Sequence, residues 1–491
     1  MKEDLSAEHE RLGRAVVEII KAHAASLEAR PVTSEATPAD LEKLFDEPLP
    51  REGMSADAIL DQFNEMVSPH AMQIPSPRYY GLFNPTPLPL AVWADALASS
   101  LNQNGAVWRN SPSANVCEAR VLRWLCELIG YDAAADSRSF GTLTSGGSEA
   151  NLLGLKCARD RAALRARDEG LRAAGADLVA YASEQCHYSL VKSVDILGMG
   201  RESLRKIPTD DNFQIRLDLL RAEIERDLRE GRTPCCIAGA AGATSTGVVD
   251  PLDQLAELAR EYDCWFHVDA AYGGALAFSD QHRTRLKGIE RADSITIDPH
   301  KWMFVPFECG ALVVREGAQV LRAAFDITPE YLSEKREHLS GRDVEFDFFR
   351  YGQLGTRRFN ALKIWMALKH LGTRGYAAII ERQIELTHYL AGRLGELDGF
   401  RRIGPIHTAV CCFRFLPAWA AAWDGPAQDQ LQMSLQQRIE RSGAAWFSTT
   451  VLHERRALRF NINSFLTEER HLDDLVEVLR READQLSAEL S

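Results

Sequence analysis

The chain has 491 residues, enough for two or three packed units around a large core. Hydrophobic residues make up 45% of it and charged residues 26%, as in an ordinary soluble globular protein. Its 57 basic and 70 acidic side chains give a net charge of −13, which argues against nucleic acid or an anionic membrane surface as the main partner.

Two further patterns bear on where the protein works. The N-terminal residues are charged and lack the apolar segment of a signal peptide, and no run reaches the roughly 20 apolar residues of a membrane-spanning helix. The ten cysteines show no C-x-x-C spacing, so neither a zinc site nor a redox pair is indicated. We therefore expect a cytoplasmic protein with free thiols, no bound metal and no membrane contact.

The N-terminal segment, residues 1–85, is predicted to be mainly helical. Apolar residues recur at helical spacing from Glu8 to Leu27, and Thr37 followed by Pro38 is typical of a helix start. Such amphipathic helices need a partner surface for their apolar faces. The run from Ser76 to Pro89 is crowded with prolines and aromatic residues, so it is predicted to be extended chain, and its composition favours a structural connector.

A glycine-rich run, Thr144-Ser-Gly-Gly-Ser-Glu-Ala-Asn151, opens a helical pattern that continues through Arg159 to about Ala166. The free amides and positive dipole of a helix start stabilise a phosphate, and glycines allow the close approach. Capping of the helix by Ser148 is an alternative explanation of the run. The run lacks the spacing of dinucleotide and P-loop motifs, so a cofactor with one phosphate fits better.

Strand-like and helical runs alternate beyond this point. Such alternation implies crossover connections and a mostly parallel sheet covered by helices on both faces. His187 follows the first of these strands and Thr244 the third, at the strand ends where open α/β sheets bind ligands. The predicted strands are residues 177–182, 203–207, 235–240, 264–268, 294–297 and 311–314.

Two runs near the middle of the chain carry the most specific signal. Trp265-Phe-His-Val-Asp-Ala-Ala-Tyr-Gly-Gly274 delivers Asp269 to a strand end, and Ser294-Ile-Thr-Ile-Asp-Pro-His-Lys-Trp302 delivers Lys301 just past another. Together they resemble the group II pyridoxal-phosphate-dependent amino acid decarboxylases, the family of aromatic amino acid, glutamate and diaminobutyrate decarboxylases. The resemblance extends from about residue 60 to the C-terminus.

The resemblance implies a fold-type-I α/β architecture. A central, mostly parallel sheet covered by helices is accompanied by an N-terminal helical segment and a small C-terminal α+β domain. The expected division is a dimerisation segment (1–85), a large cofactor-binding domain (86–370) and the small domain (371–491). The implied cofactor is pyridoxal 5'-phosphate, an electron sink that the protein binds, orients and tunes.

Three residues receive catalytic roles from the resemblance. Lys301 anchors the cofactor aldehyde covalently, Asp269 keeps the pyridine nitrogen protonated, and His187 stacks on the ring. Thr244 and Ala271 match positions that contact the ring or its substituents.

The phosphate contacts are matched by Gly147, Ser148 and His300. Asp298 replaces the asparagine found at this position in the aromatic-acid enzymes, so no phosphate contact is assigned to it.

Substrate and proton-donor positions follow in the same way. Leu82, Phe83 and Asn84 are expected to line the substrate side-chain pocket. The loop at Trp108 is expected to reach a neighbouring active site, in a homodimer with two shared sites. Tyr331, in a charged segment after the lysine, resembles the loop tyrosine that protonates the α carbon once carbon dioxide has left.

Three arginines are left without a settled role. Thr356 interrupts the family's Leu-Gly-Arg-Arg run before Arg357 and Arg358, close to where substrate selectivity is set. Arg459 could bind a carboxylate or form a structural ion pair.

The sequence therefore predicts a pyridoxal-phosphate-dependent carboxy-lyase that converts an L-amino acid, aromatic or large and apolar, into an amine and carbon dioxide. Aldehyde formation, carbon–carbon lysis, and a glutamate or diaminobutyrate substrate are alternatives on the same fold. An inactive dimeric scaffold is a further alternative, against which the intact Lys301, Asp269 and His187 argue.

Overall fold

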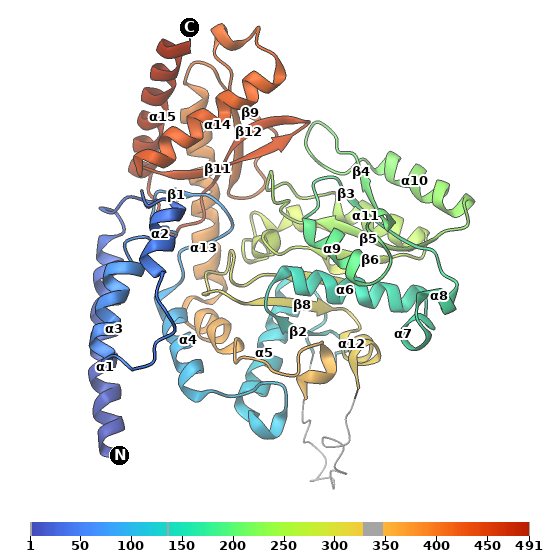
Figure 1. Ribbon diagram of the computed structural model, residues 1–491. Helices are drawn as coiled ribbons and strands as arrows, with labels where there is room; N and C mark the ends of the chain where they lie inside the picture. The colour runs from blue at the N-terminus through green and yellow to red at the C-terminus, as the bar shows by residue number, and fades with distance from the viewer. Residues whose placement is uncertain (1, 135–136, 328–346, 491) are drawn as a thin grey trace. The chain divides into compact units, whose positions relative to one another are not determined.

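The computed structural model describes residues 2–134, 137–327 and 347–490, which form two compact units (Figure 1). Unit 1 comprises Met1–Thr86, Leu386–Ile403 and Cys412–Ser491, and unit 2 comprises Pro87–Glu385 and Gly404–Cys411. The N-terminal helices therefore share a unit with the C-terminal part of the chain. The division into three domains, with boundaries after residues 85 and 370, stays a prediction.

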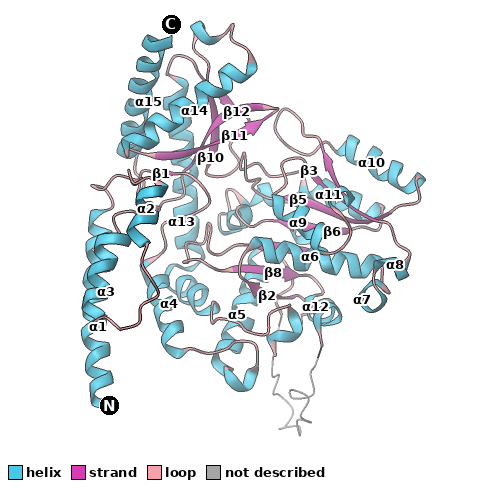
Figure 2. Cartoon of the chain, viewed as in Figure 1, coloured by secondary structure: helices cyan, strands magenta, loops and turns pink. Residues whose placement is uncertain are grey.

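A seven-stranded sheet forms the centre of unit 2, in the order β2-β8-β7-β6-β5-β3-β4 (Figure 2, magenta). The strands from β7 to β4 pair in parallel, whereas β8 is antiparallel to both of its neighbours. The predicted mostly parallel sheet is thus confirmed, although β2 is not among the predicted strands. The strands are β2 (Phe140–Thr144), β3 (Leu178–Ser183), β4 (Leu204–Ile207), β5 (Thr233–Ala240), β6 (Trp265–Asp269), β7 (Ser294–Ile297) and β8 (Gly310–Val314).

Four of the longer helices of unit 2 connect successive strands of this sheet, as expected for crossover connections: α6 (Gly147–Ala162), α9 (Tyr188–Ile196), α10 (Leu217–Arg229) and α11 (Leu252–Glu261). α4 (Pro89–Leu101) and α5 (Pro112–Leu128) precede β2, α12 (Gly317–Phe325) follows β8, and α13 (Ala361–Gly395) continues into unit 1. α6 ends four residues before the predicted Ala166, and the short α7 (Ala166–Glu169) and α8 (Leu171–Ala174) follow. Short 3-10 turns complete the unit at η2 (Trp108–Asn110), η3 (Arg201–Ser203), η4 (Gly273–Phe278), η5 (Arg283–Leu286), η6 (Ile289–Arg291) and η8 (Phe348–Tyr351).

Helices cover both faces of this sheet, as successive residues of β6 show. His267 turns toward α6, where a Cβ built on Gly154 would lie 2.8 Å from its ring. A Cβ built on Gly239 of the adjacent strand would instead meet Leu255 of α11 and, at 3.6 Å, Phe266. Because adjacent side chains of a strand point to opposite faces, α6 and α11 cover opposite faces of the sheet.

Unit 1 contains a five-stranded sheet in the order β1-β11-β12-β10-β9. Its strands are β1 (Tyr79–Tyr80), β9 (Phe400–Ile403), β10 (Val410–Phe415), β11 (Trp446–Leu452) and β12 (Arg455–Asn461). α14 (Gly425–Ser442) packs on β11 and β12 and against α15 (Glu469–Leu490).

The N-terminal part of unit 1 is helical, as predicted, with α1 (Lys2–Ser26), α2 (Pro38–Phe45), α3 (Ala56–Gln62) and a π-helical turn η1 (Phe63–Val67). Thr37 caps α2: its hydroxyl accepts a hydrogen bond from Asp40 N at 3.2 Å, and the Asp40 carboxylate accepts one from Thr37 N at 2.9 Å. Within the described ranges, no helix combines the length and the apolar character needed to cross a membrane.

Candidate active site

The predicted site residues of unit 2 follow strand ends at one edge of its sheet. β3, β5, β6 and β7 are parallel, so their carboxyl ends lie at the same edge. Asp269 is the last residue of β6, and His187, Thr244 and Lys301 follow the ends of β3, β5 and β7. β2 runs in the same direction as β7 because both are antiparallel to β8. Gly147, which follows β2, therefore starts its helix at that edge as well.

Lys301 and Asp298 form an ion pair just beyond β7. Lys301 Nζ lies 3.0 Å from Asp298 Oδ2, and the carboxylate is almost completely buried. His300 Nε2 lies 3.7 Å from the same oxygen, while His300 Nδ1 accepts a hydrogen bond from Cys309 N at 3.0 Å. Burial lowers the pKa of His300, which favours the neutral ring, and with Nδ1 as acceptor its proton sits on Nε2.

The start of α6 faces this ion pair. A Cβ built on Gly147 would lie 2.7 Å from Asp298 Oδ2 and 3.3 Å from the Cβ of Ala271, so the position requires glycine. The residue at the N-cap is Gly146, and Ser148 lies within the first turn. Ser148 is therefore not the cap, and the capping explanation of this run is wrong. A helix start without a side-chain cap, as α6 has in the described chain, suits the binding of an external anion.

Asp269 ends β6 with both carboxylate oxygens engaged. Oδ1 accepts a hydrogen bond from Ala271 N at 3.1 Å, and Oδ2 accepts one from Asn151 Nδ2 at 2.9 Å. The carboxylate is thereby held in one orientation at the strand end.

The two motif-bearing segments, 265–274 and 294–302, are fixed against each other. The carbonyl of Ala271 accepts a hydrogen bond from Asp298 N at 3.1 Å. The buried rings of Tyr272 and Trp302 stack with their centroids 4.6 Å apart, and Trp302 Nε1 donates to Gln383 Oε1 at 2.5 Å. Strand pairing and ring stacking therefore set the relative positions of Asp269 and Lys301.

His187 follows β3 and caps α9. Its Nδ1 lies 2.7 Å from Ser189 Oγ and accepts a hydrogen bond from Ser189 N at 3.3 Å. Burial lowers the pKa of His187, the carboxylate of Asp269 raises it, and the ammonium of Lys301 lowers it. Asp269 and Lys301 therefore both lie close enough to His187 to influence its pKa.

The remaining predicted positions are distributed over the chain. Thr244 is exposed in the turn after β5, and Trp108, in η2, donates its backbone N–H to Asp347 Oδ1 at 3.0 Å. Leu82, Phe83 and Asn84 belong to unit 1. Tyr331 lies outside the described residues. The roles of all these residues stay predictions.

Arg357 and Arg358, which the sequence left without a role, make structural contacts within unit 2. Arg357 is buried and donates to Glu118 Oε1 at 2.5 Å and to the carbonyl of Leu143 at 2.9 Å. Arg358 is exposed and donates to Ser99 Oγ at 2.6 Å. Arg357 therefore ties the segment after η8 to β2 and α5.

Comparison with known proteins decides the family, because residues 38–416 match the model of the pyridoxal-dependent decarboxylase conserved domain. The chain belongs to the pyridoxal-dependent decarboxylases. It is 31% identical over 477 residues to the aromatic-L-amino-acid decarboxylase of Bacillus atrophaeus, and the match covers 96% of this chain and 95% of that protein. It is 34% identical over 415 residues to the L-2,4-diaminobutyrate decarboxylase of Rhizobium meliloti, and the match covers 83% of this chain and 78% of that protein. A solved structure described as Oryza sativa TDC with PLP and tryptamine has a similar fold, with a TM-score of 0.91, 28% identity and 98% of both chains covered.

The predicted family, fold-type-I architecture and pyridoxal phosphate dependence of this decarboxylase are confirmed. Its residues also fit the cofactor. The start of α6, which has no side-chain cap, and the His300 Nε2–H both offer N–H donors to a phosphate. Asp269 would face the pyridine nitrogen, and Lys301, just past the neighbouring strand end, would carry the covalent link. When bound, the cofactor supplies an electron sink for the bond to the departing carboxylate.

Two features of this decarboxylase were not predicted from the sequence. One is the ion pair between Lys301 and Asp298, which are three residues apart just past a strand end. The other is Asn151, which lies one helical turn after Gly147 and so shares its sheet-facing side of α6. Because buried polar groups are hydrogen-bonded, an asparagine on the buried side of a helix predicts a polar partner on the sheet beneath it.

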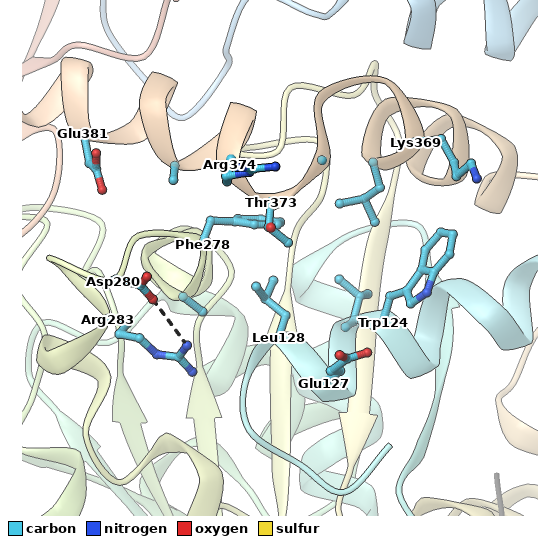
Figure 3. Close-up of a pocket in the computed structure, with 15 residues that line it drawn as sticks. Trp124, Glu127, Leu128, Phe278, Asp280, Arg283, Lys369, Thr373, Arg374 and Glu381 are labelled. Carbon is cyan, nitrogen blue, oxygen red and sulfur yellow. Dashed lines mark ion pairs between the residues drawn. The ribbon is translucent and has the colours of Figure 1, made fainter. Parts of the chain in front are cut away.

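A pocket of about 500 Å³ lies elsewhere in unit 2 of the decarboxylase (Figure 3). Trp124 and Leu128 of α5, Phe278 of η4 and Thr373 line it, the last beside the interruption of α13 at Gly372. The predicted site residues are not among its lining residues. Gly372 itself lines the pocket, and its backbone leaves helical geometry at φ 63° and ψ 175°.

Proposed function

We propose that this decarboxylase converts an aromatic L-amino acid into the corresponding amine and carbon dioxide, with Lys301, Asp269 and His187 as its central catalytic residues. The observation that carries the residue assignment is the fixed carboxylate of Asp269 at the end of β6, within electrostatic reach of His187, which Lys301 also influences. Lys301 binds the cofactor and yields its place to the substrate amine. Asp269 holds a proton on the pyridine nitrogen, and the neutral ring of His187 stacks on the cofactor.

The substrate class is inferred from the loop that carries Leu82. The carbonyl of Leu82 accepts hydrogen bonds from the side chains of Asn461 at 3.1 Å and Asn463 at 2.6 Å, and Arg459 donates to the carbonyl of Gly81 at 2.7 Å. The loop backbone is thus held on the strand and turn that carry these three residues. The side chain of Leu82 nevertheless stays 48% exposed. An apolar side chain presented from a fixed backbone favours an aromatic substrate over an acidic or diamino one.

The experiment is a measurement of carbon dioxide and amine release across the twenty amino acids plus dopa and diaminobutyrate. We expect the highest kcat/KM for tyrosine, tryptophan or dopa. Leu82→Ser should raise KM for that substrate, whereas Leu228→Ser, at a similarly exposed position of α10, should leave it unchanged. A higher kcat/KM for diaminobutyrate or glutamate would refute the aromatic assignment. Decarboxylation of diaminobutyrate is the second candidate function, because the chain is 34% identical to a diaminobutyrate decarboxylase.

A two-fold homodimer with shared active sites is part of the proposal. The described helices α1 to η1 leave apolar side chains exposed, and such faces need a partner surface. The exposed fractions are 59% for Leu5, 37% for Val16, 53% for Phe45, 53% for Ile59 and 40% for Phe63. Light scattering should give the mass of two chains. A fully active monomer would contradict the proposal.

We place the protein in the cytoplasm, with neither nucleic acid nor membrane as its partner. No disulfide links the cysteines of the described residues, which suits a reducing compartment. Cell fractionation with an activity assay tests the location, and activity recovered outside the cytoplasm would contradict it.

A further inference from the structure

The side chain of Asn151 is buried, with 1% of the residue exposed, and it lies between Asp269 of β6 and Ser189 of α9. Its Nδ2 lies 2.9 Å from Asp269 Oδ2 and 2.9 Å from Ser189 Oγ. Its Oδ1 lies 2.6 Å from Thr296 Oγ1 and 3.0 Å from His267 Nε2. A carboxamide has two N–H donors and an oxygen with two lone pairs, so each of its hydrogen-bonding positions is used.

The direction of every hydrogen bond in this group follows from Asp269. A carboxylate only accepts, so the NH₂ group of Asn151 must face it and the oxygen must face the sheet. His267 then donates from Nε2 to that oxygen and accepts at Nδ1 from Ser294 Oγ, 2.8 Å away. Ser294 in turn accepts from Trp265 Nε1 at 2.8 Å.

The same logic reaches His187 on the other side. Ser189 Oγ accepts from Asn151, so its own hydrogen is free to point at His187 Nδ1, 2.7 Å away. With Nδ1 accepting, the proton of the neutral His187 ring is on Nε2. One amide therefore sets both the orientation of a carboxylate and, through a serine, the tautomer of an imidazole.

We infer that Asn151 is a positioning residue that orients the Asp269 carboxylate toward the cofactor ring nitrogen and, through Ser189, fixes the tautomer of His187. This inference rests on the proposed roles of Asp269 and His187. In this role Asn151 touches neither substrate nor cofactor and acts only through Asp269 and Ser189. The partners of a functional carboxylate or imidazole determine its orientation and basicity, so their loss weakens cofactor binding as well as turnover.

The test uses the dissociation constant of pyridoxal phosphate from the apoprotein, read by ultrafiltration and by the absorbance of the bound cofactor. Asn151→Ala removes the donor, and the isosteric Asn151→Asp places one carboxylate against another. We expect the dissociation constant to rise about tenfold or more in both variants and the absorption maximum to shift, because a charge-assisted hydrogen bond to Asp269 is lost.

The matched control is Gln432→Leu in unit 1. Gln432 is also a fully buried amide, and it donates to and accepts from the backbone of Phe415 at 2.7 and 2.8 Å. Its loss should lower thermal stability while leaving the dissociation constant and the absorption maximum of the cofactor at the parent values. Ser189→Ala isolates the branch to His187, and it should lower kcat while changing the dissociation constant less than Asn151→Ala does.

A double-mutant cycle with Asp269→Asn separates positioning from a general structural role. If Asn151 acts through Asp269, the Asn151→Ala substitution should have little further effect in the Asp269→Asn background. Additive effects, or parent-like cofactor binding and absorbance in Asn151→Ala, would overturn the inference. If Asp269→Asn itself leaves binding, absorbance and turnover unchanged, the proposed function of Asp269 has failed instead.

Discussion

Replacing Gly154 with alanine tests how tightly α6 must lie on the sheet. Gly154 is in the middle of α6, where alanine favours the helix by about 1 kcal/mol over glycine. Here, however, a Cβ would lie 2.8 and 2.9 Å from two ring atoms of His267 and 3.3 Å from Ser294 Oγ. A helix that carries both Gly147 and Asn151 to the site would have to move away from β6.

The size of the effect follows from how His267 is held. The ring is completely buried and bound at both nitrogens, by Ser294 Oγ at 2.8 Å and by Asn151 Oδ1 at 3.0 Å. It cannot rotate away without losing one of these bonds, which costs about 1–3 kcal/mol, and an added methyl in a filled core costs about 1–3 kcal/mol. After the gain of about 1 kcal/mol in helix propensity, we expect a net destabilisation of about 1–5 kcal/mol.

The assay is urea unfolding of the apoprotein and the holoprotein, with Gly392→Ala as the matched control. Gly392 lies in α13 with nothing within 4 Å of a built Cβ, so the same substitution there should stabilise the chain by up to about 1 kcal/mol. Gly154→Ala should also weaken cofactor binding, since it displaces the start of α6. A Gly154→Ala protein as stable as the parent would refute the reasoning, because it would mean that the His267 ring can give way at no cost.

Three further predictions concern single side chains. Lys301→Ala should abolish turnover and the borohydride-trappable link to the cofactor, and covalent trapping at the parent level would show that another residue carries the link. Burial lowers the pKa of His267 to about 4, so the unfolded chain takes up a proton first, and unfolding free energy should fall as the pH drops from about 6.5 toward 4. His267→Asn should reduce the number of protons taken up on unfolding by close to one, so the fall in unfolding free energy with pH should be shallower. An unchanged pH dependence of urea unfolding would contradict this. Tyr331→Phe should leave cofactor binding intact but slow amine release, and it should let oxygen oxidise the unprotonated carbanion, giving aldehyde, ammonia and peroxide in place of amine. A parent-like amine yield would mean that another group protonates the α carbon, with His187 the next to test.

Much of the sheet could be predicted from the sequence, because the strands are short runs of apolar residues bounded by turn residues. The run from Ser294 to Ile297 is a strand as expected, and Asp298-Pro299 ends it, which places Lys301 just past its carboxyl end. The strand from Phe140 to Thr144 escaped prediction because Gly141 and two threonines interrupt its apolar pattern, and Gly141 stands in close contact with the backbone of Leu312 on β8. Local pattern thus determined the elements wherever the apolar run was uninterrupted.

Only the tertiary structure decided which polar side chains meet. Asn151 lies 38 residues from Ser189, 118 from Asp269 and 145 from Thr296, and Arg357 lies 239 residues from Glu118. These partners come together because strands distant in the sequence become neighbours in the sheet and α6 crosses them. Hydrophobic periodicity specifies which face of a helix or strand is buried, but it carries no information about the order of strands, and that order determines every contact among them.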